Sequence, residues 1–193
     1  MKKAILLFVC AVSLAVASQA QDIKFGAKAG LNLASLSGED ADEAKMKIGF
    51  HVGGLVQIPL ADQMMLQPEL VYSAQGAKDE DDDDNKLNLG YINVPVLAKY
   101  QSTSGFFGET GPQLGFLLSA KAKGDGESTN VKDYFKKTDF SWAFGIGYQT
   151  QSNLGVSARF NLGLSKLDED GESKIFNRVF QVGLFYVLGN SGK

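Results

Sequence analysis

Apolar and polar residues alternate with a period of two along most of this 193-residue chain. In Leu154–Ser165 every even-numbered position is apolar, and every odd-numbered position is glycine, serine, arginine or asparagine. Such a period places the two sets on opposite faces of a β-strand. The pattern alone does not say which face meets water, because a soluble barrel and a membrane barrel both alternate, with inside and outside exchanged.

Eight segments with this character are separated by turn-forming residues, and we expect each to be a strand. They are Ile23–Leu36, Lys47–Ile58, Met64–Gly76, Leu87–Gln101, Phe106–Lys121, Phe140–Thr150, Leu154–Ser165 and Phe176–Leu188. All reach the roughly 9–11 residues that a tilted strand needs to cross a bilayer. No long helical period interrupts them, which predicts an all-β, antiparallel, up-and-down arrangement.

The connections between these segments alternate strictly between short and long. The short ones are "PLADQ", "STSG" and "QSN", and the long ones are "SGEDADEAKM", "AKDEDDDDNK", "AKGDGESTNVKDYFKKTD" and "KLDEDGESKI". Tight turns on the periplasmic side and long loops on the outer side are typical of outer-membrane barrels. The sequence therefore predicts an eight-stranded transmembrane β-barrel with both termini on the periplasmic side.

Side-chain volume and aromatic placement favour an apolar face turned toward lipid. An eight-stranded barrel has an interior only just filled by ordinary side chains, so it has no room for the bulky apolar set. We expect small and polar residues to fill the interior instead. Aromatic residues of the apolar set fall into two predicted belts, as at the two membrane interfaces. They are Phe50, Tyr72, Phe140, Trp142 and Phe180 near the outer end, and Phe25, Tyr100, Phe106, Tyr148 and Tyr186 near the inner end.

Three prolines fall inside expected strands: Pro68, Pro95 and Pro112. A closed barrel has no free edge at which a missing N–H donor is harmless. We therefore expect β-bulges or register offsets at these positions.

The first twenty residues are typical of a secretory signal peptide. Lys2 and Lys3 precede the apolar run "AILLFVCAVSLAVA", and "SQA" ends in a small-residue cleavage site at Ala20. This predicts a signal peptide at residues 1–20, a barrel domain at residues 21–193 and an outer-membrane location. The single cysteine, Cys10, lies inside the apolar run, so it supplies no disulfide or metal ligand to the mature chain.

Charge is concentrated in the loops. Without Lys2 and Lys3, the chain has 17 basic and 22 acidic residues, which does not favour nucleic-acid binding. Seventeen of the acidic residues lie within the four long loops, and Asp139 is the last residue of the third; we expect an unidentified extracellular or envelope partner to bind these loops. The run "DEDDDDNK" invites a calcium hypothesis, but it lacks the spacing and the turn glycine of an EF-hand loop.

Six ionisable residues of the polar set are expected inside the barrel. They are Lys28, His51, Glu69, Lys99, Glu109 and Arg159. One interpretation is a pore lining or a proton site; the favoured one is a structural network that fills the bore, because buried charges must be paired. Glu69 and Glu109 are the expected partners of Arg159. His51 has no identifiable serine–acid partner, and the sequence predicts no catalytic residue, cofactor or metal site.

Several motifs resemble one family. "LQPELVYSAQGAK", "YINVPVLAKY", "FFGETGPQLGFLLSAK" and the closing "NRVFQVGLFYVL" are similar to the PorT-like outer-membrane β-barrel family common in Bacteroidetes. The resemblance implies an eight-stranded barrel, with a link to protein secretion in some relatives, and it supplies no catalytic residues. Asn93 is a departure, because many members have an acidic residue there. In the last strand, Gln181, Gly183, Tyr186 and Leu188 resemble the signal read by the outer-membrane assembly machinery.

These observations predict a monomeric, non-enzymatic barrel in outer-membrane lipid, with a structural or interaction role. Two alternatives stay open at the level of sequence. One is a soluble, lipocalin-like carrier of an apolar ligand, and the other is a narrow channel for small solutes.

Overall fold

The computed structural model describes residues 23–38, 45–78, 85–124, 127–167 and 174–188. The predicted signal peptide and most of the acidic loop residues lie outside the described residues. Within them the chain forms nine strands and one short 3₁₀ helix. In chain order these are β1 (Lys24–Ser37), β2 (Lys45–Ala61), β3 (Met64–Lys78), β4 (Lys86–Gln101), β5 (Phe106–Gly124), β6 (Glu127–Asn130), η1 (Lys132–Tyr134), β7 (Thr138–Gln149), β8 (Leu154–Gly163) and β9 (Phe176–Leu188).

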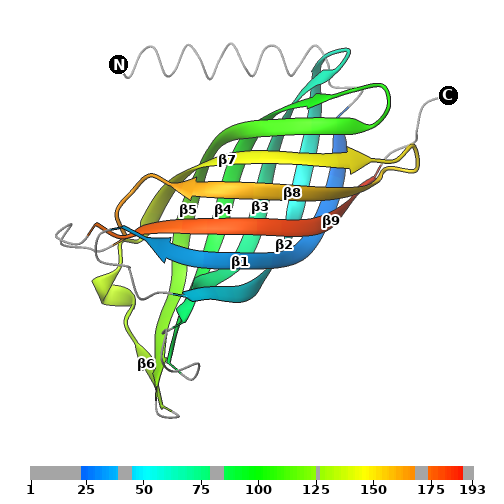
Figure 1. Ribbon diagram of the computed structural model, residues 1–193. Helices are drawn as coiled ribbons and strands as arrows, with labels where there is room; N and C mark the ends of the chain where they lie inside the picture. The colour runs from blue at the N-terminus through cyan, green and yellow to red at the C-terminus, as the bar shows by residue number, and fades with distance from the viewer. Residues whose placement is uncertain (1–22, 39–44, 79–84, 125–126, 168–173, 189–193) are drawn as a thin grey trace, which may run out of the picture.

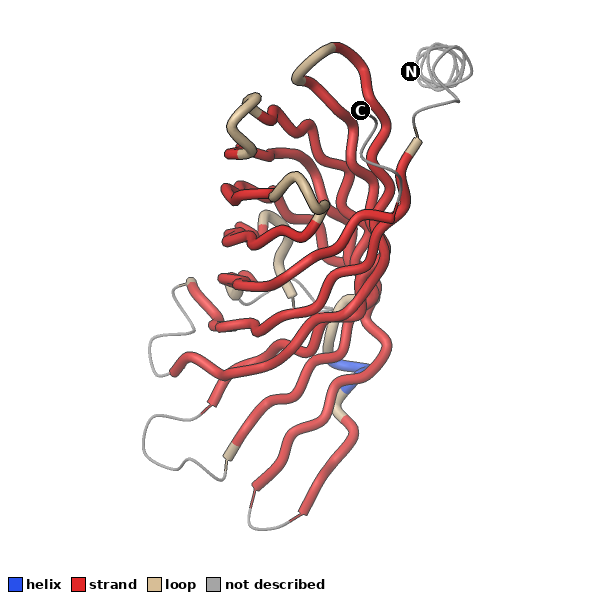
Figure 2. The backbone as a smooth tube through the Cα atoms, turned by 90° about the vertical axis from the view of Figure 1, so that its right-hand side faces the viewer, coloured by secondary structure: helices blue, strands red, loops and turns tan. Residues whose placement is uncertain are grey.

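Eight of these strands close into an antiparallel barrel (Figures 1 and 2). Each strand pairs with its neighbour in the chain except across the β5–β6–β7 region, where β5 pairs with both β6 and β7. The barrel closes where β1 pairs with β9, from Phe25 opposite Leu188 to Ser37 opposite Phe176. The predicted eight-stranded barrel is thereby confirmed, while β6 and η1 occupy a loop for which the sequence predicted no regular structure.

The short connections all lie at one end of the barrel, called here the short-turn end. They are the turns 62–63, 102–105 and 150–153, between β2 and β3, β4 and β5, and β7 and β8. Gly105 and Asn153 have positive φ angles of 98° and 65°, which tight turns require and which glycine and asparagine tolerate. The predicted alternation of short and long connections is confirmed, and the opposite end is called the long-loop end.

The apolar face of the strands points outward. Phe160 on β8 is 38% exposed, whereas the preceding residue, Arg159, is only 3% exposed. Nine of the ten predicted belt aromatics are exposed, and the tenth, Tyr72, packs against Phe50 with ring centroids 5.7 Å apart. Since a soluble surface would not be built from these side chains, the prediction of a lipid-facing apolar set is confirmed.

The prediction of bulges or offsets at the three prolines was wrong. The register is the same on both sides of Pro68 and Pro95 in the β3–β4 pair, and of Pro112 in the β5–β7 pair. Each proline is paired with a residue of one neighbouring strand and has no paired residue on the other neighbouring strand. A missing N–H removes one hydrogen bond without requiring an extra residue, so the strands continue in step. The register shifts lie elsewhere, at Met46/His51, Pro59/Ala61 and Gly90/Tyr91.

At the long-loop end, the strands on one side of the barrel extend further than those on the other side. The last β5–β7 pair joins Phe116 to Thr138, but β5 continues to Gly124 and pairs there with β6. We call β6, η1 and the parts of β2–β5 that lie beyond the Phe116–Thr138 pair the outer extension. It points downward in Figure 1. A buried apolar cluster supports its base. It consists of Leu89, Tyr91, Leu117 and Ala120, packed against Leu87, Val131 and Phe135.

Candidate functional site

The interior of the barrel carries the candidate site, because polar side chains from all around the wall meet there. The six predicted interior residues are each between 1% and 6% exposed. They come from six of the eight barrel strands, since Lys28 lies on β1, His51 on β2, Glu69 on β3, Lys99 on β4, Glu109 on β5 and Arg159 on β8. The alternation of each strand therefore directs them into one narrow space.

Arg159 bridges two carboxylates at the centre of the bore. Its Nη1 and Nη2 donate to the two oxygens of Glu69 at 2.8 and 2.7 Å, a bidentate pair. Its Nε and Nη2 donate to Oε1 of Glu109 at 2.8 and 2.6 Å. Sequence reasoning did not choose between the two carboxylates, and the structure places both on the same guanidinium. The planar fork of arginine suits this double recognition.

Two further side chains complete this cluster. Lys28 Nζ donates to Oε2 of Glu69 at 3.0 Å. The amide of Gln67 donates to Oε1 of Glu69 at 2.8 Å and to Oε2 of Glu109 at 3.3 Å. We call Lys28, Gln67, Glu69, Glu109 and Arg159 the central cluster. Its carboxylates are almost fully satisfied by donors, which is the condition under which buried charge is tolerated.

A glycine makes room for the central cluster. A Cβ atom at position 145 would lie 2.7 Å from Oε1 of Glu109, closer than real contacts allow. Gly145 faces Glu109 on β5 and Arg159 on β8 in the strand register. The absence of a side chain there lets the ion pairs cross in front of β7.

His51 belongs to a separate, uncharged layer nearer the long-loop end. Its Nδ1 lies 2.8 Å from Oδ1 of Asn32, and Gln181 Nε2 donates to the same oxygen at 3.0 Å. Asn32 Nδ2 donates to Ser73 Oγ at 3.0 Å and to two backbone carbonyls. His51 thus contacts an amide and has no carboxylate or nucleophilic hydroxyl as a described hydrogen-bond partner, which is the arrangement of a structural histidine.

An apolar layer crosses the bore on the short-turn side of the central cluster. We call Leu55, Phe107, Phe185 and Val187 the aromatic floor. The Phe107 and Phe185 rings meet edge to face with centroids 5.7 Å apart. They lie over Gly147 and Gly155, where added Cβ atoms would come within 2.3 and 2.1 Å of the rings. The expectation of a purely small and polar interior was therefore wrong, because each bulky ring has a glycine as its partner on the adjacent strand.

Lys99 lies at the aromatic floor and outside the central cluster. Its Nζ is 3.8 Å from the Phe107 ring centroid and 4.9 Å from that of Phe185, within cation–π range. Its Nζ donates to Oε1 of Gln149 at 3.2 Å. Among the described residues, no carboxylate oxygen lies within 4.0 Å of it.

Two comparisons bear on this architecture. The sequence model of the family described as "Outer membrane protein beta-barrel domain" matches residues 18–169, more than half of the chain. The chain belongs to this family. It is an eight-stranded barrel of the outer membrane, and the apolar outer face described above meets lipid.

Solved structures similar to this outer-membrane barrel support the fold. Neisserial surface protein A is 13% identical, with a TM-score of 0.58 over 84% of this chain and 96% of that one. Ail, the attachment invasion locus protein of Yersinia pestis, is 16% identical in its complex with sucrose octasulfate, with a TM-score of 0.51 over 86% and 99%. OprG of Pseudomonas aeruginosa is 12% identical, with a TM-score of 0.51 over 86% and 96%. No curated protein sequence matches the chain.

This identification removes one alternative left open by the sequence. A soluble carrier would line its interior with apolar side chains, whereas this outer-membrane barrel has Lys28, Glu69, Glu109 and Arg159 at the centre of its bore and most of its large apolar side chains outside. The described residues contain no helix long and apolar enough to cross a membrane. They also contain no group of three or more His, Cys, Asp or Glu side chains arranged to hold a metal ion.

The last strand of the outer-membrane barrel completes its wall. Gln181 and Gly183 point inward, whereas Tyr186 and Leu188 are 48% and 59% exposed on the lipid face. β9 pairs with β8 on one side and with β1 on the other. Recognition of these four residues by the assembly machinery stays a prediction.

Sequence reasoning missed some interior residues. Asp139 is 6% exposed at the long-loop end, where Ser165 donates to it at 2.6 Å. Gln67 and Asn32 are the amides that connect the buried carboxylates and His51 to their surroundings. Gln67 and Asn32 lie on the polar parity of their strands, so counting amides together with charges would have found them, whereas Asp139 precedes the strand that was expected to begin at Phe140.

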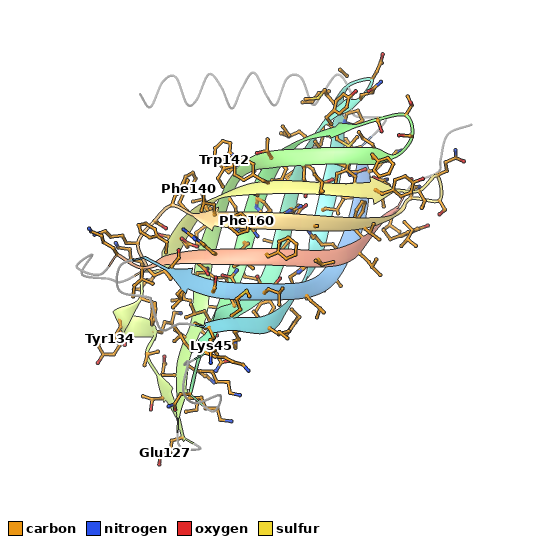
Figure 3. All side chains as sticks on the ribbon, in the orientation of Figure 1. Lys45, Glu127, Tyr134, Phe140, Trp142 and Phe160 are labelled. Atoms are coloured by element: carbon orange, nitrogen blue, oxygen red, sulfur yellow. The ribbon has the colours of Figure 1, made fainter. Side chains whose placement is uncertain are left out.

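Lysines gather on the outer extension of this outer-membrane barrel. Lys45 on β2 is opposite Lys78 on β3, Lys78 is opposite Lys86 on β4, and Lys86 is opposite Lys123 on β5. We call these four residues the lysine row; Lys45 is labelled in Figure 3. Like charges directly opposite each other destabilise a sheet, so this arrangement is not explained by strand pairing.

Proposed function

We propose that this outer-membrane barrel is a closed, non-enzymatic scaffold that presents its outer extension to a partner outside the cell. The observation that carries the proposal is the central cluster, in which Arg159 joins carboxylates from β3 and β5 across the bore. An eight-stranded barrel has only enough interior for side chains. The ion pairs and the aromatic floor therefore support a bore that is closed to solutes.

A narrow solute channel is the competing function, and planar bilayer recordings distinguish the two. Purified barrel, folded and inserted, is expected to give no stepwise current at any applied voltage, while a porin in the same bilayer conducts. Reproducible current steps from the folded protein would overturn the closed scaffold. Folding is checked on the same sample by its resistance to protease.

The outer extension is the proposed contact surface. The buried cluster around Leu117 packs at the base of the extension. Further from the barrel, Tyr134 is 74% exposed. Figure 3 shows Tyr134, Glu127 and Lys45 on this part of the molecule, pointing away from the barrel. A rigid base with exposed aromatic and charged side chains is a suitable binding surface, because aromatic anchors dominate the energetics of many interfaces.

Cross-linking on whole cells tests the contact surface. We expect a cross-linked partner to be captured by the native barrel and lost in a variant with Tyr134→Ala and Lys86→Glu together. The matched control is Tyr100→Ala, an exposed tyrosine of the short-turn belt that the proposal does not use. Equal capture by all three proteins would argue against the outer extension as the surface.

The finer family assignment is also part of the proposal. We infer that the chain is PorT-like and linked to protein secretion, since the four quoted motifs follow the order of that family. Deleting the gene in its host and measuring secreted protein tests this link. Cleavage of residues 1–20 as a signal peptide stays a prediction of the sequence.

A further inference from the structure

A buried lysine at the short-turn end of the bore lacks a counter-ion. Lys99 is 1% exposed, and buried charges are normally paired with an opposite charge. Glu109 is opposite Lys99 in the strand register, but its two oxygens already accept from Arg159 and Gln67. Both oxygens of Glu69 likewise accept from Arg159, and Asp139 lies at the long-loop end. The ammonium of Lys99 therefore retains donors for another acceptor.

Gln149 connects the buried Lys99 to a polar cavity. A cavity of about 500 Å³ opens at the short-turn end, a volume within the range of small-molecule sites. Gln149, which accepts from Lys99, lines this cavity together with Gln57 and Gln101. Its Oε1 accepts from both Lys99 and Gln57. The amide nitrogen of Gln149 has no hydrogen-bond partner among the described residues. It is therefore an available donor on the same side chain that accepts from Lys99.

We propose that this cavity binds a small oxyanion, held by the amide of Gln149 and by the positive charge of Lys99. The chemistry is that of a carboxylate or a phosphate, since both accept from amide and ammonium donors. The aromatic floor bounds the site, because the Phe107 and Phe185 ring centroids lie 3.8 and 4.9 Å from Lys99 Nζ. The site is separate from the outer extension, so it stands independently of the proposed contact surface.

Titration of the folded barrel in lipid nanodiscs tests this site. Sodium phosphate and sodium acetate are the probes, added at constant ionic strength while the backbone amide signals of Gln57, Gln101 and Gln149 are followed by NMR. We expect saturable shifts of these signals with at least one probe. The probe that binds more tightly identifies the oxyanion as phosphate or carboxylate.

Variants distinguish specific binding of the oxyanion near Lys99 from nonspecific attraction of anions to positive charge. Lys99→Met is expected to weaken binding about tenfold or more, because a charge-assisted contact is lost. Lys24→Met is the matched control, since Lys24 lines the same cavity near its rim, and its effect is expected to stay below about threefold. If Lys99→Met does not fold, Gln149→Leu replaces it, with the same expected loss. Absence of saturation with both probes, or unchanged affinity in the variant that folds, would overturn the proposal.

Discussion

Arg159 and Phe160 are neighbours in the chain, yet they lie in opposite surroundings. Arg159 makes four hydrogen bonds to two carboxylates inside the barrel, while Phe160 lies on the outer face between Phe144 and Phe180 in the register. The lipid face requires only apolar surface, so one apolar side chain can replace another there. The lumen requires particular partners in particular positions, because each unpaired charge is costly.

The largest effect is expected in the lumen. Arg159→Met should lower the free energy of unfolding by about 3–5 kcal/mol, because it leaves two buried carboxylates without their main partner. Equilibrium urea titration of the barrel in lipid vesicles measures this loss. Arg178→Met is the matched control on the outer face of β9, and its expected effect is within about 0.5 kcal/mol. A similar loss in both variants would show that the central cluster has no special role.

A smaller effect is expected on the lipid face. Phe160→Arg should cost about 2–4 kcal/mol if residue 160 lies near the bilayer midplane, because a charge then enters hydrocarbon. Phe160→Leu keeps the side chain apolar and should cost less than about 1.5 kcal/mol. The same urea titration measures both. A tolerated arginine at this position would contradict the lipid-facing assignment.

The smallest effect is expected in the outer extension. Tyr134→Ala should change the free energy of unfolding by less than about 0.5 kcal/mol, because the side chain is 74% exposed beyond the barrel. Thermal unfolding in vesicles measures this change. A large loss would mean that Tyr134 supports the fold and is not available to a partner.

The repetitive parts of the molecule were predictable from sequence, because they follow from local chemistry. The period of two and the alternation of loops predicted eight strands, their facing and the outer-membrane location. They also directed Lys28, Glu69, Glu109 and Arg159 to the same side of the wall. Which of them meet was not predictable, since it depends on the stagger of β3, β5 and β8 around the closed barrel.

Features that depend on shape in three dimensions were missed or wrongly predicted. Phe107 and Phe185 occupy the lumen because Gly147 and Gly155 make room for them on other strands, which no single strand reveals. The prolines interrupt pairing without shifting register, an outcome that depends on the neighbouring strands. β6 forms only because β5 extends past the barrel and offers an edge for pairing.

Exchanging Arg159 and Phe160 tests whether the polar parity of β8 faces the lumen and the apolar parity faces lipid. The double variant Arg159→Phe with Phe160→Arg keeps the composition of the chain and reverses only which residue faces lipid. The exchanged barrel is expected to lose at least about 5 kcal/mol in urea titration in vesicles, the sum of the lower expected costs at the two sites, or to fail to fold. An exchanged barrel that folds with the free energy of unfolding of the native protein would contradict the assignment of lumen and lipid face.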